Sequence, residues 1–173
     1  MNLRRKKRGE KMRQFILHLL GALWCLCWAI PIWLIYILPM WLIFKELEFV
    51  EWDGPFIACF VLTKEDGEPY RTWHQKLWRN WGGVGLPCAY IVKYKTFMSK
   101  QLEEGKSNPY ITKILRILRQ HEKRHVLQWF VFGPLFPLVY ILGMYAGLAH
   151  GDHYNLNPLE MDAVKASTRR EDV

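Results

Sequence analysis

Cysteine is scarce in this sequence, and its spacing matches no common metal or redox motif. The chain has 173 residues and four cysteines, at positions 25, 27, 59 and 88, of which the first two lie inside an apolar run. This spacing excludes a zinc knuckle and a paired redox motif. We therefore expect reduced cysteines with a structural role.

The chain also lacks the glycine-rich signatures of nucleotide binding. The cluster Gly82-Gly83-Val84-Gly85 has neither the Lys-Ser/Thr of a phosphate loop nor the spacing of a dinucleotide site, so we interpret it as a turn. No internal repeat is visible. The length suits one compact domain, and 51% hydrophobic residues exclude disorder over most of the chain.

Charged residues are absent from a run of thirty, at positions 15–44. A membrane-spanning helix needs about 20 apolar residues, so this run is long enough for one tilted span and too short for two. Pro31 and Pro39 would kink it, or split it into a span and an interfacial or re-entrant piece. Its four tryptophans suit the aromatic belts of a bilayer. A signal peptide fits poorly because its apolar region has only about 7–15 residues; a buried core helix is the remaining alternative.

Positive charge is concentrated before this run. The first thirteen residues hold seven Lys or Arg and one Glu, which is +6 of the formal net charge of +8. We expect residues 1–14 to form a basic tail that stays cytoplasmic and touches anionic lipid. A basic, Trp-rich segment at 71–81 has a composition that stacks bases, but beside an anchor we interpret it as interfacial or core. Membrane lipid is thus the expected partner, and nucleic acid is not.

The remaining residues, 45–173, are expected to form one α+β, mostly helical domain. Acidic residues at 46–53 mark the exit from the anchor. Residues 56–62 predict a short strand closed by a turn at 65–67, residues 86–98 predict one longer strand, and residues 103–109 predict a solvated loop. Helical periodicity then covers residues 110–132.

This helix contains the motif His121-Glu122-Lys123-Arg124-His125. Two histidines four positions apart project together from a helix and bind one zinc ion, while the intervening Glu122 is placed to act as general base. From the His and Glu content of this chain, the pattern arises by chance in roughly one such sequence in eighty. The alternative is a pair of core histidines beside an exposed Glu.

A second uncharged run, residues 126–149, would pass a length criterion for a span. A straight helix of that length rises about 36 Å and would separate the motif from everything downstream. Gly133-Pro134 and Pro137 instead predict a turn after residue 132 and a returning helix to about residue 149. This helical hairpin lies either in the core or dipped into lipid.

A zinc site needs a third protein ligand. Downstream, Asn157-Pro158-Leu159-Glu160 opens another helix, with Asn157 as N-cap, Pro158 at the first helical position and Glu160 where a capping-box Glu stands. Glu160 is therefore a candidate ligand with a structural alternative. His150 and His153, in a loop just before it, are the other candidates.

Together these residues resemble a known family. The segments His121-Glu122-x-x-His125-Val126-Leu127-Gln128, Gly133-Pro134-Leu135-Phe136 and Tyr154-x-x-Asn157-Pro158-x-Glu160-x-Asp162-Ala163 are similar to small gluzincin-like zinc metallopeptidase domains of bacteria and phages. The resemblance covers about residues 110–167. It implies a minigluzincin-like domain in which a short sheet accompanies the motif helix, the hairpin and a C-terminal helix.

The resemblance also implies roles for individual residues. His121, His125 and Glu160 would bind Zn²⁺, which ranks Glu160 ahead of His153 and His150, and Glu122 would be the base. Apart from the resemblance, we expect His153, Tyr154 and Asp162 either to hydrogen-bond a metal ligand or to stabilise an oxyanion. One departure stands out: Lys123-Arg124 replace the apolar and small residues usual between the motif Glu and the second His, and such bulky cations are expected to crowd a substrate strand.

Two functions follow as hypotheses. The first is a membrane-anchored zinc metallopeptidase-like protein acting on a peptide substrate. The second is a non-catalytic phage or bacterial envelope membrane protein whose histidines, or whose metal, are structural. A single span would place the body outside the cytoplasm, whereas a re-entrant anchor would leave it inside.

Overall fold

A computed structural model describes residues 2–63, 76, 82–93 and 109–168. The turn at 65–67, most of the Trp-rich segment, residues 94–98 of the longer strand and nearly all of the loop at 103–109 lie outside these residues. The elements in chain order are α1 (Asn2–Trp24), α2 (Leu26–Ile32), two π-helical turns η1 (Trp33–Ile37) and η2 (Pro39–Ile43), β1 (Leu47–Trp52), β2 (Ala58–Leu62), β3 (Gly83–Leu86), β4 (Ala89–Val92), α5 (Pro109–Phe132), the 3₁₀ turn η4 (Gly133–Leu135), α6 (Phe136–Ala149) and α7 (Pro158–Thr168). The fold is mixed α+β and mostly helical, as expected.

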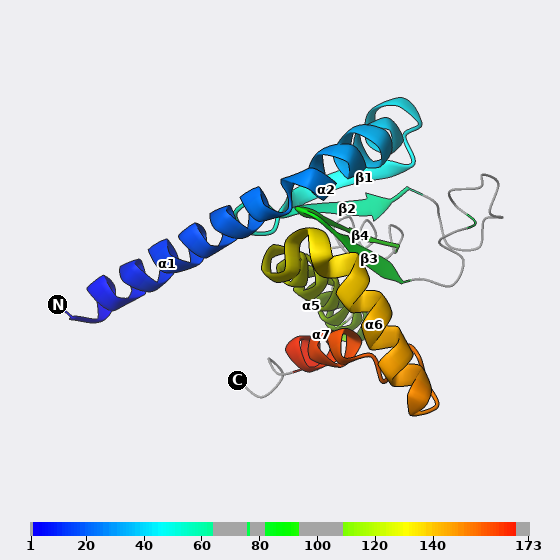
Figure 1. Cartoon of the computed structure of the whole chain (residues 1–173). Helices are drawn as coiled ribbons and strands as arrows, with labels where there is room; N and C mark the ends of the chain where they lie inside the picture. Colours follow the sequence, from blue (N-terminus) through cyan, green and yellow to red (C-terminus); the bar gives the residue numbers. More distant parts are fainter. Residues whose placement is uncertain (1, 64–75, 77–81, 94–108, 169–173) are drawn as a thin grey trace.

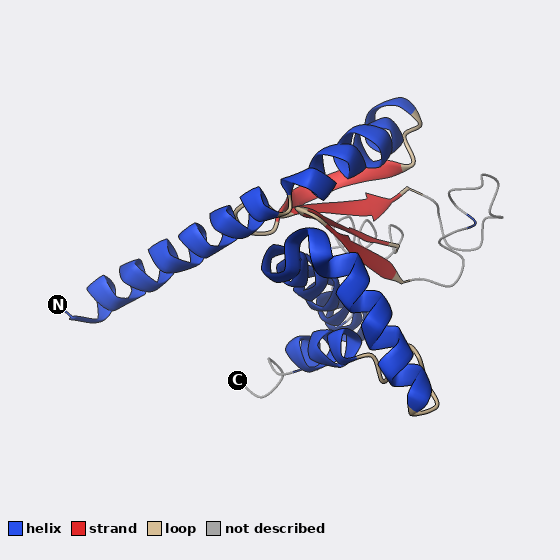
Figure 2. Cartoon of the chain, in the orientation of Figure 1, coloured by secondary structure: helices blue, strands red, loops and turns tan. Residues whose placement is uncertain are grey.

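A small four-stranded sheet lies between two helical layers (Figures 1 and 2). Its order is β1-β2-β4-β3, with β2 and β4 parallel and the outer pairs antiparallel. Because side chains alternate along a strand, Cys59 and Val61 of β2 pack with Val126 of α5, whereas Phe60 and Leu62 pack with the helical turns η1 and η2. The two central strands, β2 and β4, are therefore buried on both faces.

Residues 2–43 form an almost continuous N-terminal helical segment, interrupted at Cys25. Basic tail and predicted anchor are thus one helical element. Ile37 and Met40 are buried against the sheet, while many large apolar side chains on the outer side are exposed. The helical turn η2 ends at Ile43, one residue before the predicted end of the anchor, and the anchor and the sheet share a core.

Among the residues that the structure describes, two helical stretches are long and apolar enough to cross a membrane, Leu26–Ile43 and Arg116–Ala149. The second is not one straight helix. It comprises α5, η4 and α6, and the chain reverses at Gly133, whose φ of +54° is left-handed and favours glycine. The Trp24 indole lies directly against this glycine and leaves no room for a side chain. The predicted hairpin of α5 and α6 is confirmed, and the position of its ends relative to a membrane stays a prediction.

The sequence-based interpretation of residues 82–98 is wrong in two respects. The glycine cluster forms most of the edge strand β3 instead of a turn, and residue 86 ends that strand instead of beginning one. The turn lies at Pro87-Cys88, followed by β4. The cause is tertiary: α5 crosses β3 so closely that a Cβ on Gly83 would lie 2.7 Å from Glu122 Oε1. Glycine is required there for helix contact.

The acidic stretch at 46–53 was interpreted only as an exit from the anchor, and it forms the edge strand β1. Leu47 is buried, and the acidic residues Glu48 and Glu51 point outward. Alternation of apolar and charged residues was the available signal. A β-bulge between Phe49 and Glu51 breaks that period and hides it.

Gly85 provides a test of the packing between α5 and β3. A Cβ there would collide with the Cβ of His125 and lie 2.7 Å from the Glu122 carbonyl oxygen. We expect Gly85→Ala to lower the free energy of unfolding by about 1–3 kcal/mol, because backbone and Cβ atoms cannot move aside cheaply. Thermal unfolding in detergent measures this change. Gly9→Ala, on α1 with open space around it, is the matched control and should be neutral or slightly stabilising.

Candidate metal centre

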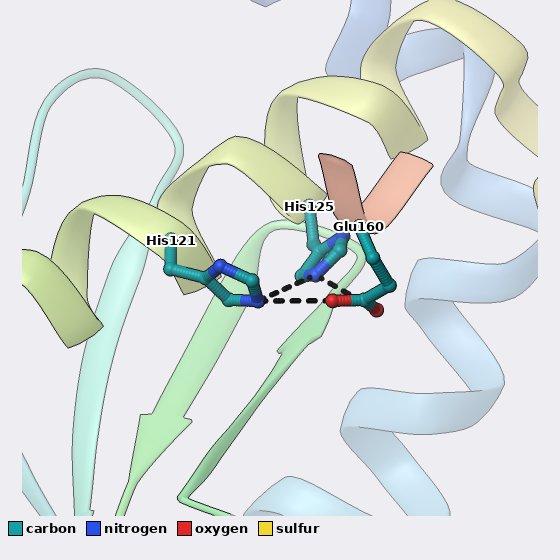
Figure 3. A group of neighbouring side chains, drawn as sticks. All are labelled: His121, His125 and Glu160. Atoms are coloured by element: carbon teal, nitrogen blue, oxygen red, sulfur yellow. Dashed lines mark hydrogen bonds and ion pairs between the residues drawn. The ribbon is translucent and has the colours of Figure 1, made fainter. Parts of the chain in front are cut away.

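His121, His125 and Glu160 meet at one point, although Glu160 lies thirty-five positions after His125 (Figure 3). Their possible ligand atoms all lie within 4.8 Å of one another. His121 Nε2 is 3.2 Å from His125 Nε2 and 3.2 Å from Glu160 Oε2. His125 Nε2 is 3.4 Å from Glu160 Oε1.

The group is close enough to share one metal ion, and the two histidines lie nearest to different oxygens of Glu160, His121 to Oε2 and His125 to Oε1. Glu160 Oε2 is also buried and has no hydrogen-bond partner of good geometry among the described residues. A buried carboxylate oxygen without a hydrogen bond is unfavourable unless a cation or a hydrogen-bond donor binds it. The three side chains therefore fit a divalent metal ion such as zinc.

The motif histidines are placed by α5, where four residues make slightly more than one turn and align both rings on the side facing α7. Glu160 is placed by the start of α7. Asn157 is the predicted N-cap: its Oδ1 accepts a hydrogen bond from Leu159 N at 3.1 Å. The Asn157 backbone N–H donates to Tyr154 O instead of to Glu160. Glu160 thus forms no capping box, and its carboxylate turns to the histidines.

Gln128 holds the ring of His125. Gln128 Oε1 lies 2.8 Å from His125 Nδ1, so Nδ1 carries the proton and Nε2 is free to bind a cation. The Gln128 amide nitrogen donates to Leu159 O and to Asp162 Oδ2, both at 2.9 Å. Asp162 therefore lies behind Gln128, where it supports the orientation of His125 without contacting the ligand atoms. Sequence reasoning missed Gln128 as a participant.

Glu122 is 5% exposed and lies over Gly83 of β3. Burial raises the pKa of its carboxyl to about 7, against the opposing charges of His121 and His125. A carboxylate with a pKa near neutrality suits a group that accepts and releases protons. The predicted base therefore stands beside the ligand cluster, on the side toward the edge strand.

The electrostatics of the cluster favour a charged Glu160. Burial alone would raise the pKa of this carboxyl, but the nearby imidazoles of His121 and His125, followed by the Tyr140 hydroxyl, hold it well below its usual value. Burial lowers the pKa of His125, and the hydrogen bond and charge of Glu160 outweigh it, so that the pKa is raised overall. Each group thus stabilises the charged form of its neighbour.

Two tyrosines border the cluster. Tyr140, on α6, donates a hydrogen bond to Glu160 Oε1 at 2.5 Å, and its ring lies near the ring of His125. The sequence contains no motif that identifies Tyr140, because only the return of α6 brings it there. Tyr154 is half-exposed at the rim; burial, followed by the charge of Glu160, raises the pKa of its phenol. Its role as an oxyanion residue stays a prediction.

His150 and His153 are exposed in the turns after α6. Within the described part of the chain, the group of metal-ligating side chains consists of His121, His125 and Glu160 only. Asp152 instead caps its own turn, with Oδ1 accepting hydrogen bonds from the backbone N–H of Tyr154 and Asn155, both at 2.9 Å. The structure thus places neither of these two histidines among the ligands.

Lys123 and Arg124 pair with acidic residues of neighbouring elements, and their expected crowding of a substrate strand stays a prediction. Lys123 Nζ lies 2.6 Å from Asp53 Oδ1, after β1, on the opposite side of α5. Arg124 makes two hydrogen bonds to Asp162 of α7, at 2.7 and 3.0 Å. Both cations therefore tie α5 to its neighbours, and the second of them supports the element that carries Glu160.

Comparisons with known proteins add nothing to this geometry. No family model, curated protein or solved structure matches the chain. The arrangement of the site therefore carries the functional argument alone.

Proposed function

We propose that this chain is a membrane-anchored, zinc-dependent peptidase of the gluzincin type. One observation carries the proposal: two motif histidines and a distant Glu converge closely enough to hold one metal ion, with Glu122 beside them. His121, His125 and Glu160 would hold a zinc ion, which when bound would supply the activation of water and the polarisation of a carbonyl group.

In this proposal each side chain around the metal site has a separate role in hydrolysis. The Glu122 carboxylate accepts the proton of the attacking water and passes it to the leaving amine. Tyr154, at the rim, donates a hydrogen bond to the oxygen on which negative charge develops. Gln128 and Tyr140 keep His125 and Glu160 in place.

The edge strand β3 supports a peptide as substrate class. It is the outer strand of the sheet beyond β4, and its glycines lie directly under Glu122 and His125. An extended polypeptide that adds to a sheet edge forms main-chain hydrogen bonds without regard to side-chain identity. A peptide paired in this way would run past the cluster.

Attachment to the membrane rests on residues 15–44. Their outer side exposes large apolar residues, among them Leu20, Leu34 and Ile35. We place the basic residues 1–14 on the cytoplasmic side, against anionic lipid, by the positive-inside rule.

The proposal is tested on full-length protein purified in detergent. We expect one zinc per chain by elemental analysis, and hydrolysis of a mixed fluorogenic peptide library that 1,10-phenanthroline abolishes and added zinc restores. Absence of stoichiometric zinc would refute the metal site. One tightly held zinc without any hydrolysis would refute the peptidase and favour a membrane protein with a structural metal.

A further inference from the structure

Helix α6 has an outward side made of apolar residues alone. The chain carries no charge between residues 126 and 149. Five large residues project outward from α6 with about half or more of their surface exposed: Leu138, Ile141, Leu142, Tyr145 and Leu148. Exposure of such an apolar surface to water is unfavourable. A large exposed apolar patch marks a site that contacts a protein or a membrane.

The packing of α6 fixes this orientation. On its inward side a Cβ on Gly143 would collide with Asn157, and a Cβ on Gly147 would lie 2.7 Å from Asp152 O. Tyr140, also inward, bonds Glu160. The inner side of α6 packs against the loop before α7 and hydrogen-bonds Glu160. Rotation of α6 to bury its outer side would break these contacts.

The apolar side of α6 is continuous with the N-terminal helical segment. Trp24 packs on Gly133, and Trp28 Nε1 donates to Pro134 O at 3.1 Å. Both tryptophans remain partly exposed, as are Val131 and Leu135 beside them. Figure 1 shows that α6 begins beside the middle of the N-terminal helical segment and runs at a steep angle to it. The two exposed apolar surfaces therefore meet around Gly133.

We infer that α6 lies in the outer part of a lipid bilayer, as a second membrane contact beside residues 15–44. A protein partner would meet a surface with a polar rim, which α6 lacks over its whole exposed side. A bilayer accepts a wholly apolar helix face and fits the basic start of the N-terminal segment as well. The contact with lipid does not depend on the proposed zinc chemistry.

This contact determines how far His121, His125 and Glu160 lie from the bilayer. A helix with its side chains is about 10–12 Å thick, and Tyr140 reaches Glu160 from the inner side of the same helix whose outer side meets lipid. The cluster thus lies about one helix thickness from the acyl chains. Polypeptides held at the membrane surface are within its reach.

Site-specific photo-crosslinking tests the inference on the full-length protein. A diazirine amino acid replaces Leu142 of α6, Val164 on the exposed side of α7 as matched control, or Leu34 of the predicted anchor as positive control. The variants are reconstituted in vesicles of phosphatidylcholine and phosphatidylglycerol. We expect lipid adducts at 142 comparable to those at 34, and at least five-fold fewer at 164.

Two results would overturn the inference: adducts at 142 as few as at 164 while 34 is labelled, or crosslinks from 142 to a second copy of the chain in place of lipid. The same measurement in a His121→Ala variant tests the lipid contact independently of the proposed zinc chemistry. There the lipid adducts at 142 should persist, whether or not the protein ever hydrolyses a peptide.

Discussion

Replacement of His125 by alanine is expected to abolish stoichiometric zinc binding. The variant loses one of three converging ligands and leaves Glu160 with only one histidine partner. Loss of a hydrogen-bonding partner behind a ligand already costs roughly 10–100-fold in metal affinity, so loss of the ligand itself should cost more. Elemental analysis after dialysis measures the zinc content per chain, and competition with a chromogenic chelator measures the zinc affinity.

A graded set of variants makes this test specific. Gln128→Leu leaves all three ligands but removes the hydrogen bond to His125 Nδ1, so we expect a loss within that 10–100-fold range. Glu160→Gln replaces an anionic ligand with a neutral one and should fall between this variant and His125→Ala. His153→Ala, exposed and outside the cluster, should bind zinc like the parent.

The opposite pattern would contradict the site. If Glu160→Gln binds zinc like the parent while His153→Ala does not, His153 is the third ligand and the gluzincin assignment is wrong. If every variant binds zinc equally, the metal sits elsewhere.

Replacement of Glu122 by glutamine is expected to retain zinc and lose nearly all hydrolysis. Glutamine keeps the shape that lies over Gly83, and Glu122 is not among the ligand atoms. Its neutral amide cannot accept a proton from water, and loss of a general base typically costs 10²–10⁴-fold in rate. Single-turnover hydrolysis at matched zinc content measures the effect.

His153→Ala again serves as the control in this assay and should leave the rate near that of the parent. If Glu122→Gln loses zinc together with activity, Glu122 supports the fold or the ligands and is not a base. If its rate equals that of the parent, water activation does not involve Glu122.

The local elements were accessible from the sequence because each depends on neighbours in the chain. Helical periodicity predicted α5 at 110–132, and the structure has it at Pro109–Phe132. Gly133 and the following prolines predicted the reversal, and Asn157 predicted the start of α7. Turn and capping chemistry acts over a few residues, so no tertiary knowledge was needed.

The role of Glu160 was ambiguous for the same reason. Locally it stands where a capping-box Glu stands, and only the return of α6 brings it next to the motif histidines. His150 and His153 were equally plausible ligands on spacing alone. Their exposure in the turns after α6 separates them from Glu160.

The edge strand β3 shows the limit of local patterns. Glycine-rich stretches predict turns because glycine tolerates unusual backbone angles. In β3, Gly83 and Gly85 are needed instead because Glu122 and His125 lie directly above them. The requirement comes from a helix more than thirty residues away, which no local pattern records.

The sequence by itself determined the His-Glu-x-x-His pattern on its helix, the thirty-residue apolar run and the turn that reverses the chain, since spacing, composition and backbone chemistry are local properties. The tertiary structure decided that the predicted anchor shares a core with the sheet, that Lys123 and Arg124 pair with Asp53 and Asp162, and that Tyr140 and Gln128 support the ligands. Each of these depends on which distant surfaces meet when the sheet is covered on both faces, and burial of apolar side chains makes that choice.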